Sequence, residues 1–205
     1  IYSTEEGSET ITIHALRYVS KKFSRNFEAY RHKVSGRSFA SYFDETGREV
    51  PARLSDSPIE EYQEITSLIG DGRGHHGMDF KAPVGTPILA PWDGQIVRTN
   101  WNWKYNGNSV ELRSHDGRHI ARFLHLDKLT EGIAAKTRVK KGQPLAKSGN
   151  TGRSSAPHLH YEISDGSGRV LNPLEVHDTH HPRLSGSQFE DFKAVMGKLK
   201  SRLGS

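Results

Sequence analysis

Short alternating stretches of apolar and polar residues run through the chain, broken by residues that favour turns. Residues 10–19 (TITIHALRYV) and 38–43 are rich in β-branched and aromatic side chains, which predicts two strands. The composition of residues 44–47 (DETG) predicts a turn, and the polar residues 57–64 predict a connector or a single helical turn. The glycine-rich run at residues 70–74 predicts a loop, since glycine adopts positive φ angles freely.

Between residues 81 and 173 the predicted strands are short and are separated by Gly, Pro and Asn at close spacing. This pattern is typical of an antiparallel β-sandwich or barrel. Two segments, 84–90 (VGTPILA) and 141–147 (KGQPLAK), each place a Gly-x-Pro turn before a short apolar strand. We predict that they form two related hairpins within one antiparallel β-sheet.

Near the C-terminus the spacing of apolar residues changes from that of a strand to that of a helix. Ser187 and Glu190 have the spacing of a capping box. Apolar side chains then recur at helical spacing: Phe189, Phe192, Val195, Met196 and Leu199. We predict an amphipathic helix that packs on the β domain. A partner or membrane helix is the less favoured alternative, because the apolar stripe is short.

These patterns divide the chain into an N-terminal accessory β segment with a linker (1–60), a β domain (61–178) and a tail with the helix (179–205). A length of 205 residues suits one compact domain with attached segments. No apolar run approaches the roughly 18 residues of a membrane span. Since the chain begins at Ile1, we expect a trimmed or mature form whose signal or anchor segment is not part of this chain. We also expect a monomer.

The composition limits the chemistry that the chain can carry. It has no cysteine, which excludes disulfides, thiolate zinc sites and cysteine nucleophiles, so a metal site must use histidine and carboxylate. There are 12 histidines, most of them between His75 and His181. The net charge of +5 and the pI of about 9.4 favour an anionic partner: nucleic acid, a membrane surface or an acidic cell-wall polymer.

Two histidines share one face of a predicted strand. In residues 157–163 (PHLHYEI) polar and apolar residues alternate, so His158, His160 and Glu162 lie on one face. The two histidines are then about 6–7 Å apart along the strand, which suits one metal ligand and one neighbour of the metal. For this motif alone, an exposed polar strand face is the alternative. Glu162 either orients His160 or is an exposed strand carboxylate.

A second cluster, residues 75–80 (HHGMDF), favours metal ligands over an exposed polar strand face. His75 and Asp79 lie in an extended context and share a face, whereas His76 points the other way and is predicted to be an exposed bystander. Imidazole and carboxylate are normal zinc ligands. His75, Asp79 and His160 would supply three ligands and leave a fourth position open, which is the arrangement of catalytic zinc sites.

Three motifs then occur in a fixed order: His75-x-x-x-Asp79, Phe123-Leu124-His125-Leu126 and His158-x-His160. Further segments agree with them: 85–87 (GTP), 93–94 (DG), 106–108 (NGN), 139–143 (VKKGQ), 149–154 (GNTGRS) and 172–174 (NPL). Together they resemble the M23 family of peptidoglycan endopeptidases, of the LytM or lysostaphin type, over about residues 65–175. A lone histidine such as His125, at the end of an apolar strand, is otherwise more often structural than catalytic.

The resemblance implies that His75, Asp79 and His160 bind one zinc ion per chain, and that His125 and His158 are catalytic without ligating it. It also implies a mainly β catalytic domain, with an antiparallel β-sheet or sandwich and a groove that holds an extended stem peptide of peptidoglycan. Zinc would activate water, while one histidine takes the proton or steadies the oxyanion. Which histidine is the general base stays open.

The resemblance also bears on the substrate. Arg73 gives the Arg-x-His form common in Gram-negative members, and residues 42–48, 57–58 and 65–67 resemble the segment that precedes the catalytic domain of Gram-negative murein D,D-endopeptidases. This implies cleavage of the D-Ala–meso-diaminopimelate cross-link rather than a glycine bridge, in the periplasm or cell envelope. Residues 101–107 (WNWKYNG) depart from the family's shorter turn, and their aromatic side chains line the groove or simply cover the sheet.

Two other classes of function compete with a peptidase. An inactive regulatory module that activates other cell-wall hydrolases would have lost metal ligands, whereas this chain keeps all three ligands and both further histidines. A nucleic-acid-binding β domain is suggested by the basic charge and by Trp101, Trp103 and Tyr105. Lys and Arg are scattered rather than gathered in one stripe, so we expect no nucleic-acid partner.

Overall fold

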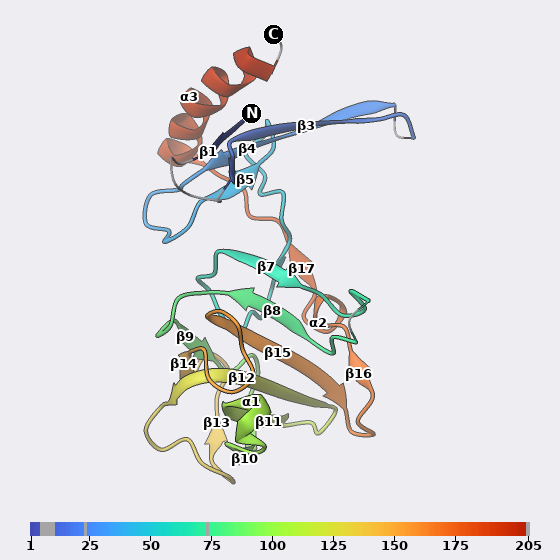
Figure 1. Cartoon of the computed structure of the whole chain (residues 1–205), viewed down its shortest axis with the longest axis vertical. Helices are drawn as coiled ribbons and strands as arrows, with labels where there is room; N and C mark the ends of the chain where they lie inside the picture. The colour runs from blue at the N-terminus through green and yellow to red at the C-terminus, as the bar shows by residue number, and fades with distance from the viewer. Residues whose placement is uncertain (5–10, 23, 73, 204–205) are drawn as a thin grey trace. The chain divides into compact units, whose positions relative to one another are not determined.

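A computed structural model describes residues 1–4, 11–22, 24–72 and 74–203 (Figure 1). The chain divides into two compact units, one made of Ile1–Arg53 with His180–Ser205 and the other of Leu54–Thr179. The short strands β6 (Arg53–Leu54) and β17 (Thr179–His180) form a two-stranded sheet. No helix in the described ranges is long and apolar enough to span a bilayer.

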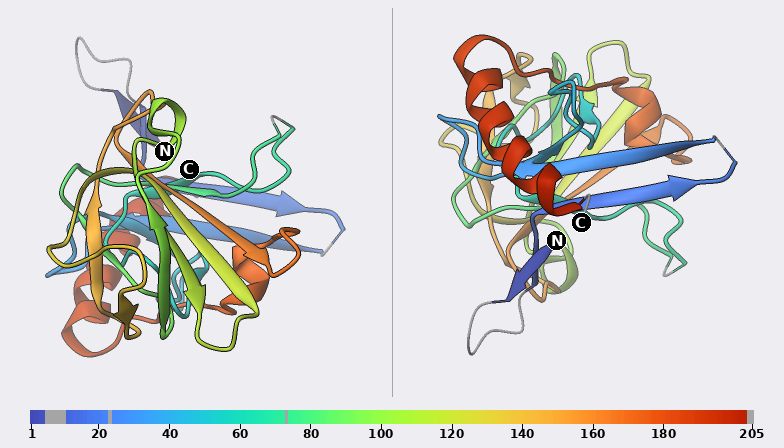
Figure 2. Two further views of the ribbon diagram at one scale, coloured as in Figure 1. Left: turned by 90° about the horizontal axis from the view of Figure 1, so that it is seen from below. Right: turned by 90° about the horizontal axis from the view of Figure 1, so that it is seen from above.

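The first unit combines the N-terminal strands with the C-terminal helix. β1 (Tyr2–Thr4) pairs with β2 (Ile11–Ile13), and β3 (Ala15–Ser20), β4 (Arg25–His32) and β5 (Ser41–Phe43) form an antiparallel sheet. Helix α3 (Gly186–Leu203) lies against β3 and β4 (Figure 2). Their shared core consists of Ala15, Tyr30, Val34, Phe43, Leu184 and Phe192.

Several sequence predictions in this unit need adjustment. The strand predicted at residues 10–19 is interrupted at His14, so that β2 and β3 are separate strands. Residue 10 lies outside the described ranges. The strand predicted at 38–43 begins only at Ser41. The C-terminal helix is present, but it begins at Gly186, so Ser187 lies inside the helix and not at its cap.

The second unit contains a ten-stranded sheet whose neighbouring strands pair in antiparallel fashion. Its main path runs β13-β10-β11-β12-β15-β8-β7, with β14 paired to β12 and β9, and β16 paired to β15. The strands are β7 (Glu64–Ser67), β8 (Met78–Lys81), β9 (Pro87–Leu89), β10 (Gly94–Thr99), β11 (Asn108–Ser114), β12 (His119–Leu129), β13 (Arg138–Val139), β14 (Pro144–Ser148), β15 (His158–Asp165) and β16 (Val170–Leu171). Two one-turn helices complete it, α1 (Trp103–Asn106) and α2 (Pro173–Val176).

The structure confirms the predicted mainly β fold with an antiparallel sheet and a C-terminal helix. The two similar segments around residues 84–90 and 141–147 behave differently from the prediction. They do not form two hairpins, because β9 and β14 pair with each other as antiparallel neighbours. The repeated Gly-x-Pro pattern therefore marks two strands of one pairing.

Strand β15 has two chemically distinct faces, as its alternation predicts. Leu159, Tyr161 and Ile163 are fully buried in the core of the second unit. His160 and Glu162 point to the opposite face. Their cross-strand neighbours on that face are Asp79 on β8 and Arg122 on β12. The apolar face thus anchors the strand while the polar face remains available for chemistry.

Behind β15, a buried histidine completes the core. The Tyr161 hydroxyl and His177 Nε2 form a hydrogen bond of 2.8 Å, and the Trp92 ring stacks on His177 with centroids 5.3 Å apart. His177 is only 4% exposed. Because burial penalises the charged imidazolium, the pKa of His177 falls to about 4.

The second unit should therefore lose stability in acid. Between pH 6.5 and 4 the unfolded chain protonates His177 while the folded chain does not, so protons favour unfolding. We expect this residue to lower the free energy of unfolding by about 2.5 kcal/mol between pH 7.5 and 4.5. Urea unfolding of the metal-free protein, followed by tryptophan fluorescence, measures it, since all three tryptophans lie in this unit. The His177→Gln variant should show a correspondingly smaller acid loss, and an equal loss in both proteins would contradict this assignment.

Candidate metal centre and active site

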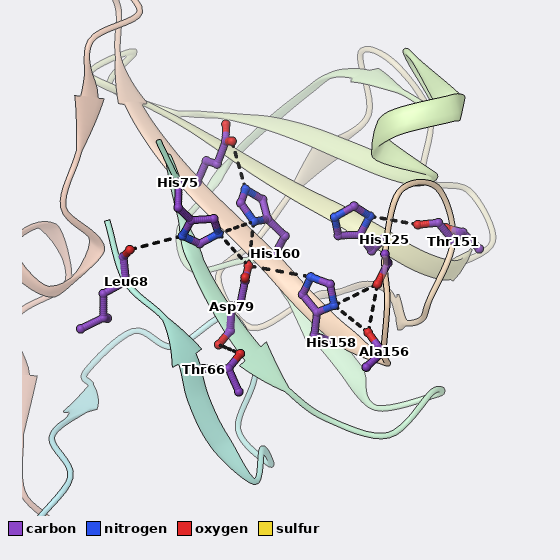
Figure 3. Close-up of polar contacts among 11 residues, drawn as sticks. Thr66, Leu68, His75, Asp79, His125, Thr151, Ala156, His158 and His160 are labelled. Carbon is purple, nitrogen blue, oxygen red and sulfur yellow. Dashed lines mark hydrogen bonds and ion pairs between the residues drawn. The ribbon is translucent and has the colours of Figure 1, made fainter. Parts of the chain in front are cut away.

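Strands β8 and β15 bring the three predicted metal ligands together (Figure 3). Asp79 on β8 stands directly opposite His160 on β15, and His75 reaches them from the loop before β8. Asp79 Oδ1 lies 2.7 Å from His160 Nδ1 and 3.0 Å from His75 Nε2, and the two nitrogen atoms are 3.1 Å apart. Gly77 is required beside them, because a Cβ there would stand 2.9 Å from His160 Nε2 and 2.5 Å from the Tyr161 carbonyl oxygen.

The outer hydrogen bonds of both imidazoles determine which nitrogen faces inward. His75 Nδ1 lies 3.3 Å from the Leu68 carbonyl oxygen, and His160 Nε2 lies 3.0 Å from Glu162 Oε1. A carbonyl and a carboxylate only accept, so these nitrogen atoms donate. In the neutral rings, His75 Nε2 and His160 Nδ1 then present lone pairs toward each other and toward the Asp79 carboxylate. Three converging acceptors repel one another unless a cation or a proton lies between them.

This donor set fits a metal ion. Ligands about 2.1 Å from zinc in a tetrahedral site lie about 3.4 Å apart, close to the separations of 2.7 to 3.1 Å seen here. Two imidazoles and one carboxylate also match the borderline character of zinc. The outer partners Leu68 and Glu162 supply the second hydrogen bond that metal-binding histidines usually make.

The electrostatics of the same group favour bound positive charge. Burial alone would raise the pKa of Asp79, but the hydrogen bond from His160 and the nearby histidines lower it to about 2. Burial alone would lower the pKa of His160, but Asp79 and Glu162 raise it to about 9. Asp79 is therefore ionised at neutral pH, and in the metal-free protein His160 carries the compensating proton.

His125 and His158 stand beside this group. Their ring centroids are 4.8 Å apart, and the centroid of His125 is 5.9 Å from that of His160. His125 Nδ1 donates to the Thr151 carbonyl over 2.9 Å, and His158 Nδ1 donates to the Ala156 carbonyl over 2.8 Å. Each neutral ring therefore keeps its Nε2 lone pair available to accept a proton. His158 Nε2 lies 3.8 Å from Asp79 Oδ1, on the side of the metal donors.

His125 has two further properties of a functional residue. Burial lowers its pKa to about 4, so the ring is neutral and able to accept a proton at neutral pH. Its φ of 62° lies in the left-handed region, which non-glycine residues rarely adopt. Such strain persists where surrounding contacts hold it and is often found at functional sites. Here the Thr151 carbonyl holds the ring.

Three further sequence predictions concern Arg73, His76 and the aromatic residues of the segment 101–107. Arg73 lies outside the described residues, and His76 is exposed, as expected of a bystander. In the segment 101–107, Trp103 is 59% exposed and Tyr105 is 47% exposed, whereas Trp101 is half-buried. Sequence reasoning missed the outer hydrogen-bond partners Leu68, Thr151 and Ala156, because they act through backbone carbonyls that no side-chain pattern reveals.

Comparison with known proteins agrees with this geometry. Residues 73–173 match the model of peptidase family M23. The chain is 34% identical over 163 residues to peptidoglycan DD-endopeptidase ShyC of Vibrio cholerae, covering 75% of this chain and 36% of that protein. It is 42% identical over 92 residues to glycyl-glycine endopeptidase ALE-1 of Staphylococcus capitis, covering 45% of this chain and 25% of ALE-1.

A solved structure supports the same conclusion. A zinc containing peptidase from Vibrio cholerae superposes with a TM-score of 0.51 at 26% sequence identity, covering 80% of this chain and 50% of that one. The fold and the His-Asp-His group define a metallopeptidase, and the chain carries a metalloendopeptidase domain of peptidase family M23. Its similarity extends both to a relative named as a peptidoglycan DD-endopeptidase and to one named as a glycyl-glycine endopeptidase, although it spans well under two thirds of each of them.

Proposed function

We propose that this chain hydrolyses peptide cross-links of peptidoglycan with one zinc ion held by His75, Asp79 and His160. The observation that carries the proposal is the convergence of three metal-ligand atoms beside two imidazoles whose Nε2 atoms are available. The relatives named as peptidoglycan endopeptidases support the substrate class. An inactive regulatory module would have no need for this complete constellation.

The mechanism divides between the metal and the two histidines. Zinc, when bound, supplies a Lewis acid that polarises the scissile carbonyl and makes water more acidic. His125 and His158 hold their Nδ1 protons on backbone carbonyls, which directs Nε2 toward the reacting groups. One Nε2 accepts the proton of the attacking water, and an imidazolium then protonates the leaving amine. Either histidine can fill either role in this geometry.

We further propose that the bond cleaved is the D-Ala–meso-diaminopimelate cross-link, in the periplasm or cell envelope. The match to ShyC, named as a DD-endopeptidase, extends over 75% of the chain. The match to ALE-1, named as a glycyl-glycine endopeptidase, extends over 45%. The longer match includes residues outside the catalytic strands, and this favours the first bond over the glycine bridge.

Purified muropeptides decide between these bonds. Zinc-loaded protein is incubated separately with a D-Ala–diaminopimelate cross-linked dimer and with a pentaglycine-bridged dimer, and the products are identified by mass spectrometry. We expect monomers with a free D-Ala carboxyl terminus from the first substrate and little product from the second. Preferential cleavage of the glycine bridge would overturn the bond assignment alone. Stoichiometric zinc without cleavage of either substrate would overturn the proposed peptidase activity.

A further inference from the structure

A row of alternating charges crosses the polar face of the sheet in the second unit. Glu162 on β15 stands opposite Arg122 on β12, Arg122 stands opposite Glu111 on β11, and Glu111 stands opposite Arg98 on β10. Cross-strand neighbours of opposite charge stabilise a sheet when they face one another. The row is therefore set by the register of the strands and not by the chance orientation of long side chains.

The side chains in this row are connected. Arg122 Nε lies 2.8 Å from Glu111 Oε2, and Arg122 Nη1 lies 3.5 Å from Glu162 Oε2. Arg98 Nη2 approaches the same Glu111 oxygen at 2.9 Å. The side chains of Glu111, Glu162 and Arg122 are only 7%, 19% and 23% exposed, so solvent screens these pairs less than typical surface pairs.

The row ends at His160 on one side and at Trp101 on the other. At one end, Glu162 Oε1 accepts from His160 Nε2 over 3.0 Å. At the other end, the Arg98 guanidinium lies 4.4 Å from the centroid of the Trp101 ring. Trp101 begins the segment that carries α1, and its carbonyl accepts from the Asn106 side chain. Asn108, which follows this segment, donates its backbone N–H to Thr151 Oγ1, and the Thr151 carbonyl accepts from His125.

We propose that Glu162 is a positioning residue for the metal ligand His160, and that Arg122, itself held by Glu111, fixes Glu162 in place. The two carboxylate oxygens of Glu162 have separate tasks, because Oε1 contacts His160 and Oε2 contacts Arg122. Keeping the His160 proton on Nε2 leaves the Nδ1 lone pair directed at Asp79 and His75. The inference rests on the proposed metal site.

Zinc affinity measured by competition with a chromophoric chelator tests this role. Loss of an outer partner typically weakens metal binding 10–100-fold. We expect about tenfold weaker binding in Glu162→Gln, which keeps an acceptor but no charge, and about 100-fold weaker binding in Glu162→Ala. Arg122→Gln should weaken binding by a few fold, and Arg122→Lys should do so less, because lysine keeps the charge but loses the fork that reaches both carboxylates.

Glu64→Gln is the matched control. Glu64 lies on β7 of the same sheet, pairs with Lys81 Nζ at 3.0 Å and has a side chain that is 53% exposed. The same chemical change there should leave zinc affinity within about twofold of the wild type. Unfolding of each metal-free protein in urea separates positioning from general stability, since a purely structural role would lower stability without a specific loss of affinity.

Two outcomes distinguish the inference from the proposed function beneath it. If His160→Ala abolishes zinc binding while Glu162→Gln and Arg122→Gln bind zinc like Glu64→Gln, the positioning role is wrong and the metal site stands. If His160→Ala binds zinc normally, the metal site itself is wrong. If Glu162→Gln proves unstable, Arg122→Gln, which keeps both His160 and Glu162 in the chain, carries the test alone.

Discussion

The His160→Ala variant is expected to bind zinc at least about 100-fold more weakly than the wild type and to lose its hydrolytic activity with the metal. Losing an outer hydrogen-bond partner already costs up to about 100-fold in affinity, and losing a ligand should cost more. His160 Nδ1 lies 2.7 Å from Asp79 Oδ1 and 3.1 Å from His75 Nε2, so its removal leaves a two-ligand site. Metal content after dialysis and the rate of muropeptide cleavage measure both losses.

His76→Ala is the control for this prediction. His76 adjoins His75 in the sequence but is exposed, so the variant should keep stoichiometric zinc and activity near that of the wild type. Retention of stoichiometric zinc by a His75→Ala, Asp79→Ala, His160→Ala triple variant would show that the ion binds elsewhere. Simultaneous replacement removes every donor of the group, so no residual ligand can account for bound zinc.

The second large effect is expected from the two histidines outside the donor set. His158→Ala should keep one zinc per chain while kcat falls by about 10²–10⁴, the usual contribution of a general acid or base. His125→Asn should do the same, and asparagine is chosen because it tolerates the φ of 62° at this position. Zinc content and kcat are measured on the same preparations.

This pair of variants separates proton transfer from metal binding. A fall in zinc content parallel to the fall in kcat would show that these histidines help to hold the metal. Retention of more than about a tenth of the wild-type kcat by both variants would remove them from the mechanism. If only one variant loses activity, the residue that it replaces performs both proton transfers.

Strand alternation was sufficient to predict which side chains share a face. It placed His158 and His160 together and separated them from the core residues Leu159 and Tyr161. It does not apply to His75 and His76, which lie in the loop before β8. It could not predict the register that sets Asp79 opposite His160, because register depends on long-range pairing of β8 with β15. The order of the motifs indicated the family, and the family match over residues 73–173 confirms it.

Other features of the site leave no trace in a sequence pattern. The carbonyls of Leu68, Thr151 and Ala156 orient three histidines through the backbone, which any residue provides. The contact between Glu162 and Arg122 follows from the pairing of β15 with β12, across 40 residues of chain. Such contacts are set by tertiary structure, whereas the identities of the ligand side chains are set by their chemistry.

Zinc-dependent cleavage of purified sacculi tests the central claim most directly. Protein stripped of metal, protein restored with one equivalent of zinc, and the restored triple variant of His75, Asp79 and His160 are compared by mass spectrometry of the material that each leaves. We predict that only the zinc-restored wild type converts cross-linked dimers into monomers by hydrolysis of a peptide bond. Intact dimers after incubation with fully zinc-loaded protein, or equal cleavage by the stripped protein, would contradict the account.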